Sequence, residues 1–488
     1  MHGPKRQMVS IFKQTTPNSV FRLALVLVLG NAVWLIWSNR FPPLQDYPDW
    51  VYQGWVFSRV LGGHSPPGYQ ILNYPVPNEM LTMSLGLLDL VFSPEISGKL
   101  VITLVIGLFT AGSIYLLTAL NRSEDNPLLF VPFVFLFNGF LFGGELAYLL
   151  GLGALFIYAG YLIRTASSPE RANPLLILVA SCVLFFTHIA AYAAAVLISA
   201  AVLCANFRKQ VWYRIVLPFL PSVLLLGWSF VAQKWHHGPA ADAVWRFWTV
   251  HQLAGAVVEV FSPFQGFLPW IGFGGPIIHG AAILNAASCV LVLCAIVATS
   301  FIPFRVRTSS SFPVGLATLF CATAVVAAGY SYGIFVCPGQ RFLLPAGWLA
   351  FCQIGFMLRG KLDHRLSLIA SLALLLFVIV QGVYYAVIWP KVSAGIAEQY
   401  AMLAGSSSSE EFQRVCQESF DLGWRRAHGP GLETMFPTYA PLTRVPYYVY
   451  LEQGDSPPIF PTGPLIKIAN GNYQNTCAAG VFVPRTNR

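Results

Sequence analysis

Charged residues are scarce in this chain. Asp, Glu, Lys and Arg make up 10% of its 488 residues, whereas hydrophobic residues make up 56% and the mean hydropathy is +0.62. A soluble domain of this size carries about a quarter charged residues. The composition therefore excludes an ordinary soluble protein and predicts a polytopic membrane protein. The net charge of +9 does not indicate a nucleic-acid partner, because basic residues gather in the cytoplasmic loops of membrane proteins.

Cysteine motifs are also missing. The sequence has no Cys-x-x-Cys pair and no zinc-type spacing, so it gives no support to a structural zinc site. Seven of the nine cysteines lie in or next to apolar segments, which is typical of small core residues. The other two, Cys416 and Cys477, lie in the C-terminal tail, where an oxidising compartment would allow them to form a disulfide.

Long apolar runs dominate what is present. A membrane-spanning helix needs about 20 mostly apolar residues, and somewhat shorter segments are tolerated. The first run follows several basic residues but lacks a small-x-small cleavage site, so it predicts an uncleaved helix. We predict an outer-surface helix at 79–94, because counting it as a span would invert every later loop. About eleven spans are predicted in all: 20–37, 98–120, 127–142, 145–163, 174–187, 189–205, 211–232, 278–303, 312–334, 341–358 and 365–389.

With these spans the basic residues sort by side. Fifteen of the 29 Lys and Arg residues fall in the predicted inner loops and six in the outer ones, and the rest lie beyond residue 390. The positive-inside rule then places the N-terminus in the cytoplasm and the C-terminus in the periplasm or outside the cell. The predicted fold is an all-α membrane domain over 1–390, with external loops 38–97 and 233–277, followed by a small external α+β domain over 391–488.

Two aspartates lie in the first external loop, within the proline-broken run FPPLQDYPDW at 41–50. Asp46 and Asp49 are separated by three residues, so one helical turn would place both on the same face. A carboxylate in this position could act as the general base toward an acceptor hydroxyl or amine. The pair could instead hold a divalent cation together with phosphate oxygens. Glu79 and Glu95 are lesser candidates in the same loop, for which an ordinary solvated position is favoured.

Four further polar residues lie at predicted outer junctions. Glu145 follows two glycines between two spans, where an acid either reaches toward water or lines a cavity. His188 stands alone among apolar residues, as a core histidine or as a ligand of a phosphate or sugar. His236 and His237 are adjacent and do not share a helix face. They are therefore candidates for a phosphate or sugar contact rather than for a two-ligand metal site.

Arg341 opens a late span on the outer side, against the positive-inside bias. A helix N-terminus offers free backbone N–H groups, and a cation beside them makes an anion site. The guanidinium suits phosphate because its donors form a planar fork. The alternative is an arginine that only anchors the helix at the membrane interface.

Together these features resemble the GT-C glycosyltransferases, closest to bacterial members similar to the arabinose and dolichyl-phosphate-mannose transferases. The resemblance covers most of 20–390 and rests on pattern: an acidic first external loop, many spans, an external C-terminal domain and a few short runs. The family's adjacent pair of acids is absent, so the choice between Asp46 and Asp49 stays open. The runs are Arg341-Phe-Leu-Leu-Pro345, Asn138-Gly-Phe-Leu-Phe-Gly143 and Thr187-His188.

The resemblance implies an enzyme of a bacterial inner membrane that transfers sugar from a polyprenyl-phosphate donor to a lipid, glycan or protein acceptor at the outer face. Asp46 or Asp49 would be catalytic, and Arg341 would bind the donor phosphate. A divalent cation is an open question, since metal use varies in the family. Two alternatives remain: a lipid or solute transporter, against which the lack of an inverted repeat argues, and a non-catalytic partner in envelope-polysaccharide assembly.

Overall fold

The computed structural model describes most of residues 16–405 and three short segments beyond them. The described residues are 16–44, 46–64, 69–71, 74–120, 126–166, 171–205, 209–237, 245–265, 279–301, 311–332, 335–359, 361–405, 447–451, 465–467 and 480–484.

Helices make up most of the described chain. In order they are α2 Pro17–Ser38, α3 Tyr47–Leu61, α4 Glu79–Asp89, α5 Pro94–Leu117, η1 Pro127–Phe130, α6 Val131–Val134, α7 Gly139–Phe142, α8 Leu146–Thr165, α9 Pro174–Thr187, α10 Ile189–Ala205, α11 Lys209–Ile215, η3 Leu217–Phe219, α12 Leu220–His237, α13 Val250–Phe261, α14 His279–Phe301, α15 Phe312–Ala328, η6 Gly339–Phe342, α16 Leu343–Leu358 and α17 His364–Gly405.

The described strands are short, and all pair in antiparallel fashion. They form three small sheets, with the orders β1-β6, β2-β3-β4 and β5-β7. The strands are β1 Tyr69–Ile71, β2 Trp245–Arg246, β3 Ser331–Tyr332, β4 Phe335–Val336, β5 Tyr447–Leu451, β6 Leu465–Lys467 and β7 Gly480–Pro484.

Four helices begin with the same sequence signature, a polar residue followed by proline. Thr16 caps α2, Ser93 caps α5, Asn126 caps η1 and Asn173 caps α9, each by accepting a hydrogen bond from a backbone N–H of the first turn. Proline follows each cap, because its fixed φ suits the first helical position and its missing N–H is not needed there. Local sequence therefore sets these starts.

Seven helices among the described residues are long and apolar enough to cross a membrane, which identifies an integral membrane protein. Shorter apolar helices occur at 127–142, 174–187, 189–205, 250–261 and 312–328. The seven are Pro17–Ser38, Pro94–Leu117, Leu146–Thr165, Trp212–Ala232, Ala281–Phe301, Pro338–Leu358 and His364–Ala394.

The predicted count of eleven spans is not confirmed. The segment 127–142 is not one continuous helix, because residues 135–138 separate α6 from α7. The predicted span 312–334 ends early, at Ala328. There Gly329 adopts a φ of +71°, a conformation that suits glycine, and the chain then turns into β3. The predicted helix at 79–94 is present as α4, which ends at Asp89.

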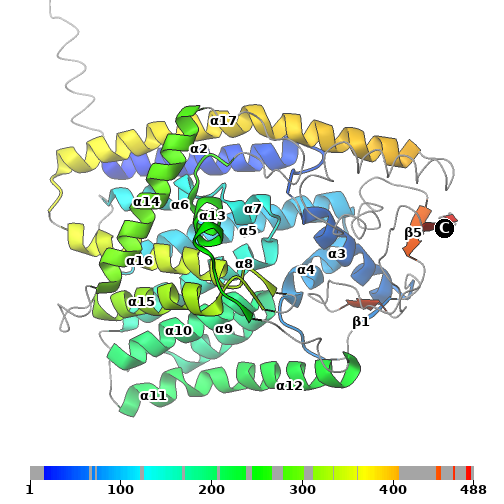
Figure 1. The fold of residues 1–488 in the computed structure, drawn as a ribbon, viewed down its shortest axis with the longest axis horizontal. Coiled ribbons are helices and arrows are strands. Elements are labelled where there is room, and N and C mark those ends of the chain that lie inside the picture. The colour runs from blue at the N-terminus through cyan, green and yellow to red at the C-terminus, as the bar shows by residue number, and fades with distance from the viewer. Residues whose placement is uncertain are drawn as a thin grey trace, which may run out of the picture.

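The helices form a bundle in which most long members run in roughly the same direction, whereas α14 crosses them (Figure 1). Helices α2 and α17 lie side by side along one edge, and α11 and α12 line the opposite edge. Helices α3 and α4 gather at one end of the bundle, near β1 and β5. Helix α17 continues through Pro390 to Gly405, so the predicted domain boundary at 391 falls inside a helix.

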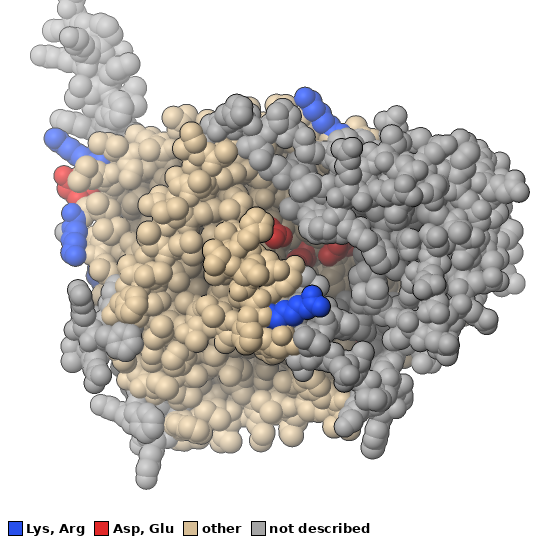
Figure 2. All heavy atoms as spheres, in the orientation of Figure 1, with Lys and Arg blue, Asp and Glu red and all other residues tan. Residues whose placement is uncertain are grey.

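The lateral surface of the bundle is uncharged over a broad area (Figure 2). Large apolar side chains on α12, α14 and α17 are exposed, among them Leu224, Phe230, Leu291 and Ile369. An apolar surface this wide would be a liability in water, whereas lipid chains cover it without cost. A few acidic atoms are visible in a recess of the same face, with a basic side chain close beside them (Figure 2).

Candidate active site

A tight turn before α8 is hydrogen-bonded to the start of α3. The Asp46 N–H donates to the Gly143 carbonyl at 3.1 Å, and the Trp50 Nε1–H donates to the Gly144 carbonyl at 2.9 Å. Gly144 has a φ of +74°, and a Cβ there would collide with the Asp46 backbone. Only glycine meets both demands without strain. The turn therefore brings Asp46 and Glu145 close together although they are far apart in the sequence.

Asp46 and Glu145 both sit at the N-cap position of a helix, yet neither side chain caps it. Aspartate is among the best capping residues, so an aspartate that leaves its helix uncapped gives up stability that the position could supply. The Glu145 carboxylate is instead used in an ion pair with the Arg341 guanidinium. Tertiary contacts override the local capping preference of this acid.

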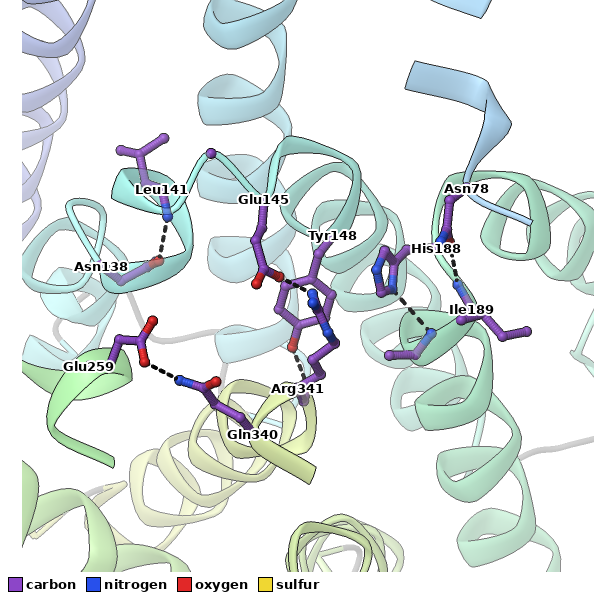
Figure 3. Close-up of polar contacts among 12 residues, drawn as sticks. Asn78, Asn138, Leu141, Glu145, Tyr148, His188, Ile189, Glu259, Gln340 and Arg341 are labelled. Atoms are coloured by element: carbon purple, nitrogen blue, oxygen red, sulfur yellow. Dashed lines mark hydrogen bonds and ion pairs between the residues drawn. The ribbon is translucent and has the colours of Figure 1, made fainter. Parts of the chain in front are cut away.

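Arg341 lies in the 3₁₀ turn η6, directly before α16, as the sequence predicts for a helix N-terminus. Its guanidinium pairs with Glu145 and lies over the Tyr148 ring, 5.3 Å from the centroid (Figure 3). The Tyr148 hydroxyl donates to the Arg341 carbonyl oxygen. The arginine is thus fixed from two sides, by an ion pair and a cation–π contact, while about a fifth of its side chain stays exposed.

Asp46 lies within the electrostatic range of this arginine. Burial raises the pKa of Asp46 to about 7, and the positive charge of Arg341 offsets part of that increase. The carboxylate is partly buried and not fully enclosed. A carboxyl group that ionises near neutral pH suits proton transfer, because it can take up and release a proton under working conditions.

A second acid approaches the same element from α13. Gln340, the residue before Arg341, donates to the Glu259 carboxylate at 2.8 Å. Glu259 also packs on Gly139, where a Cβ would collide with it. Burial raises the pKa of Glu259. Consecutive residues of η6 therefore contact acids from two different helices (Figure 3).

His188 lies next to this group but serves a structural role as well. It ends α9, and its Nδ1 accepts a hydrogen bond from the Ala190 N–H at 3.1 Å. Its ring stands edge-on to Tyr148, with 5.1 Å between centroids. Asn78 accepts from the Ile189 N–H at 2.9 Å and so holds the start of α4 against the same junction. Tyr148 thus stands between Arg341 and His188 (Figure 3).

Three predicted site residues cannot be placed in this arrangement. Asp49 lies in α3, and His236 and His237 end α12, but their side chains lie outside the described residues. The lesser acids do not lie in a solvated loop. Glu79 is in the first turn of α4, where partial burial raises its pKa to about 7, and Glu95 pairs with Lys99 at 3.0 Å in the first turn of α5.

Among the described residues, no group of three or more His, Cys, Asp or Glu side chains could hold a metal ion. Glu145 is occupied by Arg341, and the Asp49 side chain is not described, so the predicted divalent cation gains no ligand set here. We derive no step through such an ion, and its presence stays a prediction.

Sequence reasoning missed three residues of this cluster. Tyr148 lies one helical turn after Glu145, and that spacing could have pointed to it. Glu259 is one of only 20 acidic residues in the chain and lies in a predicted external loop. Gln340 precedes Arg341, but no pattern in the sequence connects it with Glu259.

Comparisons with known proteins add nothing to this geometry. No family model matches the chain, and neither the curated proteins nor the solved structures contain a match.

Proposed function

We propose that the protein is a membrane glycosyltransferase of the GT-C type, which moves a sugar from a polyprenyl-phosphate donor to an acceptor at the outer face. One observation carries the proposal: a partly buried Asp46, whose pKa is about 7, lies beside a fixed arginine whose side chain is about a fifth exposed. A general base and a phosphate-binding cation are the two groups that such a transfer needs from the protein.

In the proposed reaction Asp46 accepts the proton of the acceptor O–H or N–H. The freed electron pair attacks the anomeric carbon, the bond from that carbon to the donor phosphate breaks, and polyprenyl phosphate leaves with the bonding electrons. A single displacement of this kind inverts the configuration at the anomeric carbon. Arg341 would stabilise the leaving phosphate through charge-assisted hydrogen bonds. The sugar and the acceptor are left open by this scheme.

Glu145 limits what Arg341 can do. The guanidinium has five N–H donors, and the ion pair uses only part of this fork, so the remaining donors are available for a phosphate. The carboxylate also partly neutralises the arginine, which weakens its grip on anions. A site of this kind binds the donor phosphate with moderate affinity and can therefore release the product.

The transporter remains the rival function, because an ion pair and an acid that titrates near neutral pH are also found in proton-coupled transporters. The two functions differ in their ligand. An enzyme of the proposed kind must bind a polyprenyl-phosphate sugar and release polyprenyl phosphate. A transporter must move a solute or lipid across a membrane without changing its covalent structure.

The proposed function is tested with purified protein and a set of polyprenyl-phosphate sugars. We expect saturable binding of at least one such lipid, and release of polyprenyl phosphate once an acceptor is added. The matched measurement uses proteoliposomes to follow solute or lipid movement. Transport without any binding or breakdown of these lipids would exclude the glycosyltransferase.

The activity should depend on pH through Asp46. This base works only when it is deprotonated, and its pKa is about 7 in the folded protein. We therefore expect kcat/KM to be low at pH 5.5, to rise tenfold per pH unit below pH 7 and to level off above pH 8. A profile that is flat between pH 5.5 and pH 8 would remove Asp46 from the role of base.

A further inference from the structure

A second polar cluster lies where α3 packs against the junction of α4 and α5. It consists of the Tyr47 hydroxyl, the Ser97 hydroxyl and both carboxylate oxygens of Asp89. All four oxygen atoms are buried and none has a hydrogen-bond partner among the described residues. Tyr47 is 1% exposed and Ser97 is fully buried. A buried polar group without a partner destabilises the fold, so four in one place call for a ligand.

The three side chains lie close together. The Tyr47 ring packs directly on Gly98, the neighbour of Ser97, with Cε2 and Cζ at 2.7 and 2.8 Å from the point where a Cβ would stand. Burial raises the pKa of Asp89 to about 7, and the nearby Ser97 hydroxyl offsets part of that increase. Burial raises the pKa of Tyr47, and the negative charges of Glu95 and Asp89 raise it further. The hydroxyls therefore face the carboxylate across one junction.

The charges of this junction do not balance. Lys99 is buried and donates to Glu95 at 3.0 Å, which neutralises that acid. No ion pair of Asp89 is found among the described residues. A buried carboxylate without a partner is costly, because water no longer solvates its charge. A single positive charge placed between Asp89 and the two hydroxyls would neutralise the unpaired carboxylate.

We propose that Tyr47, Asp89 and Ser97 form a binding site for a hard metal cation. The donor set consists of oxygen atoms alone, which suits sodium, calcium and magnesium and disfavours zinc and other soft metals. The charge count of one unpaired carboxylate fits a monovalent ion, so sodium is the first ion to test. The ion would fix Tyr47, and with it the first turn of α3, directly beside Asp46.

The test measures the thermal unfolding midpoint of the purified full-length protein. Sodium chloride replaces choline chloride at constant ionic strength, and calcium and magnesium are added in separate arms. An ion that binds only the folded state stabilises it by an amount that grows with the logarithm of its concentration. We expect the midpoint to rise with sodium in the wild type and to stay constant in Asp89→Asn.

Tyr47→Phe provides the sharper variant, because it removes only an unpartnered hydroxyl. Without sodium the variant should be as stable as the wild type. With sodium it should need an about tenfold higher concentration to reach the same rise of the unfolding midpoint. Glu79→Gln is the matched control, because Glu79 is another partly buried acid of α4 and its replacement should leave the sodium response intact.

The proposal is overturned if no cation raises the midpoint, or if Tyr47→Phe and Asp89→Asn respond as the wild type does. It is also overturned if Tyr47→Phe loses the same stability in sodium and in choline. The hydroxyl would then have a partner other than the cation, and bound water would be the ligand of the cluster.

Discussion

Asp46→Asn should lower turnover by about 10²–10⁴-fold, which is the typical loss when a general base is removed. The amide has nearly the same size but cannot accept the acceptor's proton. The measurement is the rate of polyprenyl phosphate release with a verified donor and acceptor. A variant that retains near-normal turnover would show that the base is another residue, and Asp49→Asn would then be the next substitution to examine.

The same substitution should not harm folding. The pKa of Asp46 is raised from 3.8 to about 7 in the folded protein, so folding favours the protonated acid. Its contribution to stability is fully present below pH 3.8 and is lost as the pH rises through 7. Asparagine avoids the buried charge, so Asp46→Asn should unfold at the same temperature as the wild type or higher at pH 8. Glu79→Gln is the control, because it changes an acid of similar pKa away from Arg341.

Arg341→Ala should abolish donor binding and also destabilise the fold. It removes the phosphate-binding group and leaves the partly buried Glu145 carboxylate without its ion pair. A charged group left unsatisfied in this way costs about 1–3 kcal/mol. Arg341→Lys retains the charge but loses the planar fork, so it should bind the donor more weakly than the wild type. Titration with a polyprenyl-phosphate sugar gives the affinity, and thermal unfolding gives the stability.

A double variant separates the two effects. Adding Glu145→Gln to Arg341→Ala removes the unpaired charge, so stability should return while donor binding stays lost. Recovery of both would mean that the single variant failed only because it was misfolded. Unchanged donor affinity in Arg341→Ala would reduce Arg341 to a structural anchor of α16.

Part of the candidate site could be predicted from the sequence, because it follows from the small number of acidic residues and from the predicted membrane topology. Acidic residues are few, and the positive-inside bias placed Asp46, Glu145 and Arg341 on one predicted face. In the structure the three residues lie close together, and the side of the membrane on which they lie stays a prediction. The ion pair of Glu145 with Arg341 was not predicted, because its partners are 196 residues apart and no local pattern encodes their contact. The eleven-span count remains unconfirmed, because hydropathy alone does not reveal the break at 135–138 or the turn at Gly329.

Composition and local pattern are enough to specify a helical membrane protein and the start of several helices. Hydrophobic composition decides whether lipid or water surrounds the chain, and a polar cap followed by proline starts a helix within a few neighbouring residues. Which polar groups share an environment depends instead on how the helices pack. Gly144 allows α3 to approach α8, and that approach buries Asp46 and raises its pKa. Burial and charge pairing are properties of contacts between distant segments, so the chemistry of the site emerges only once the helices have packed.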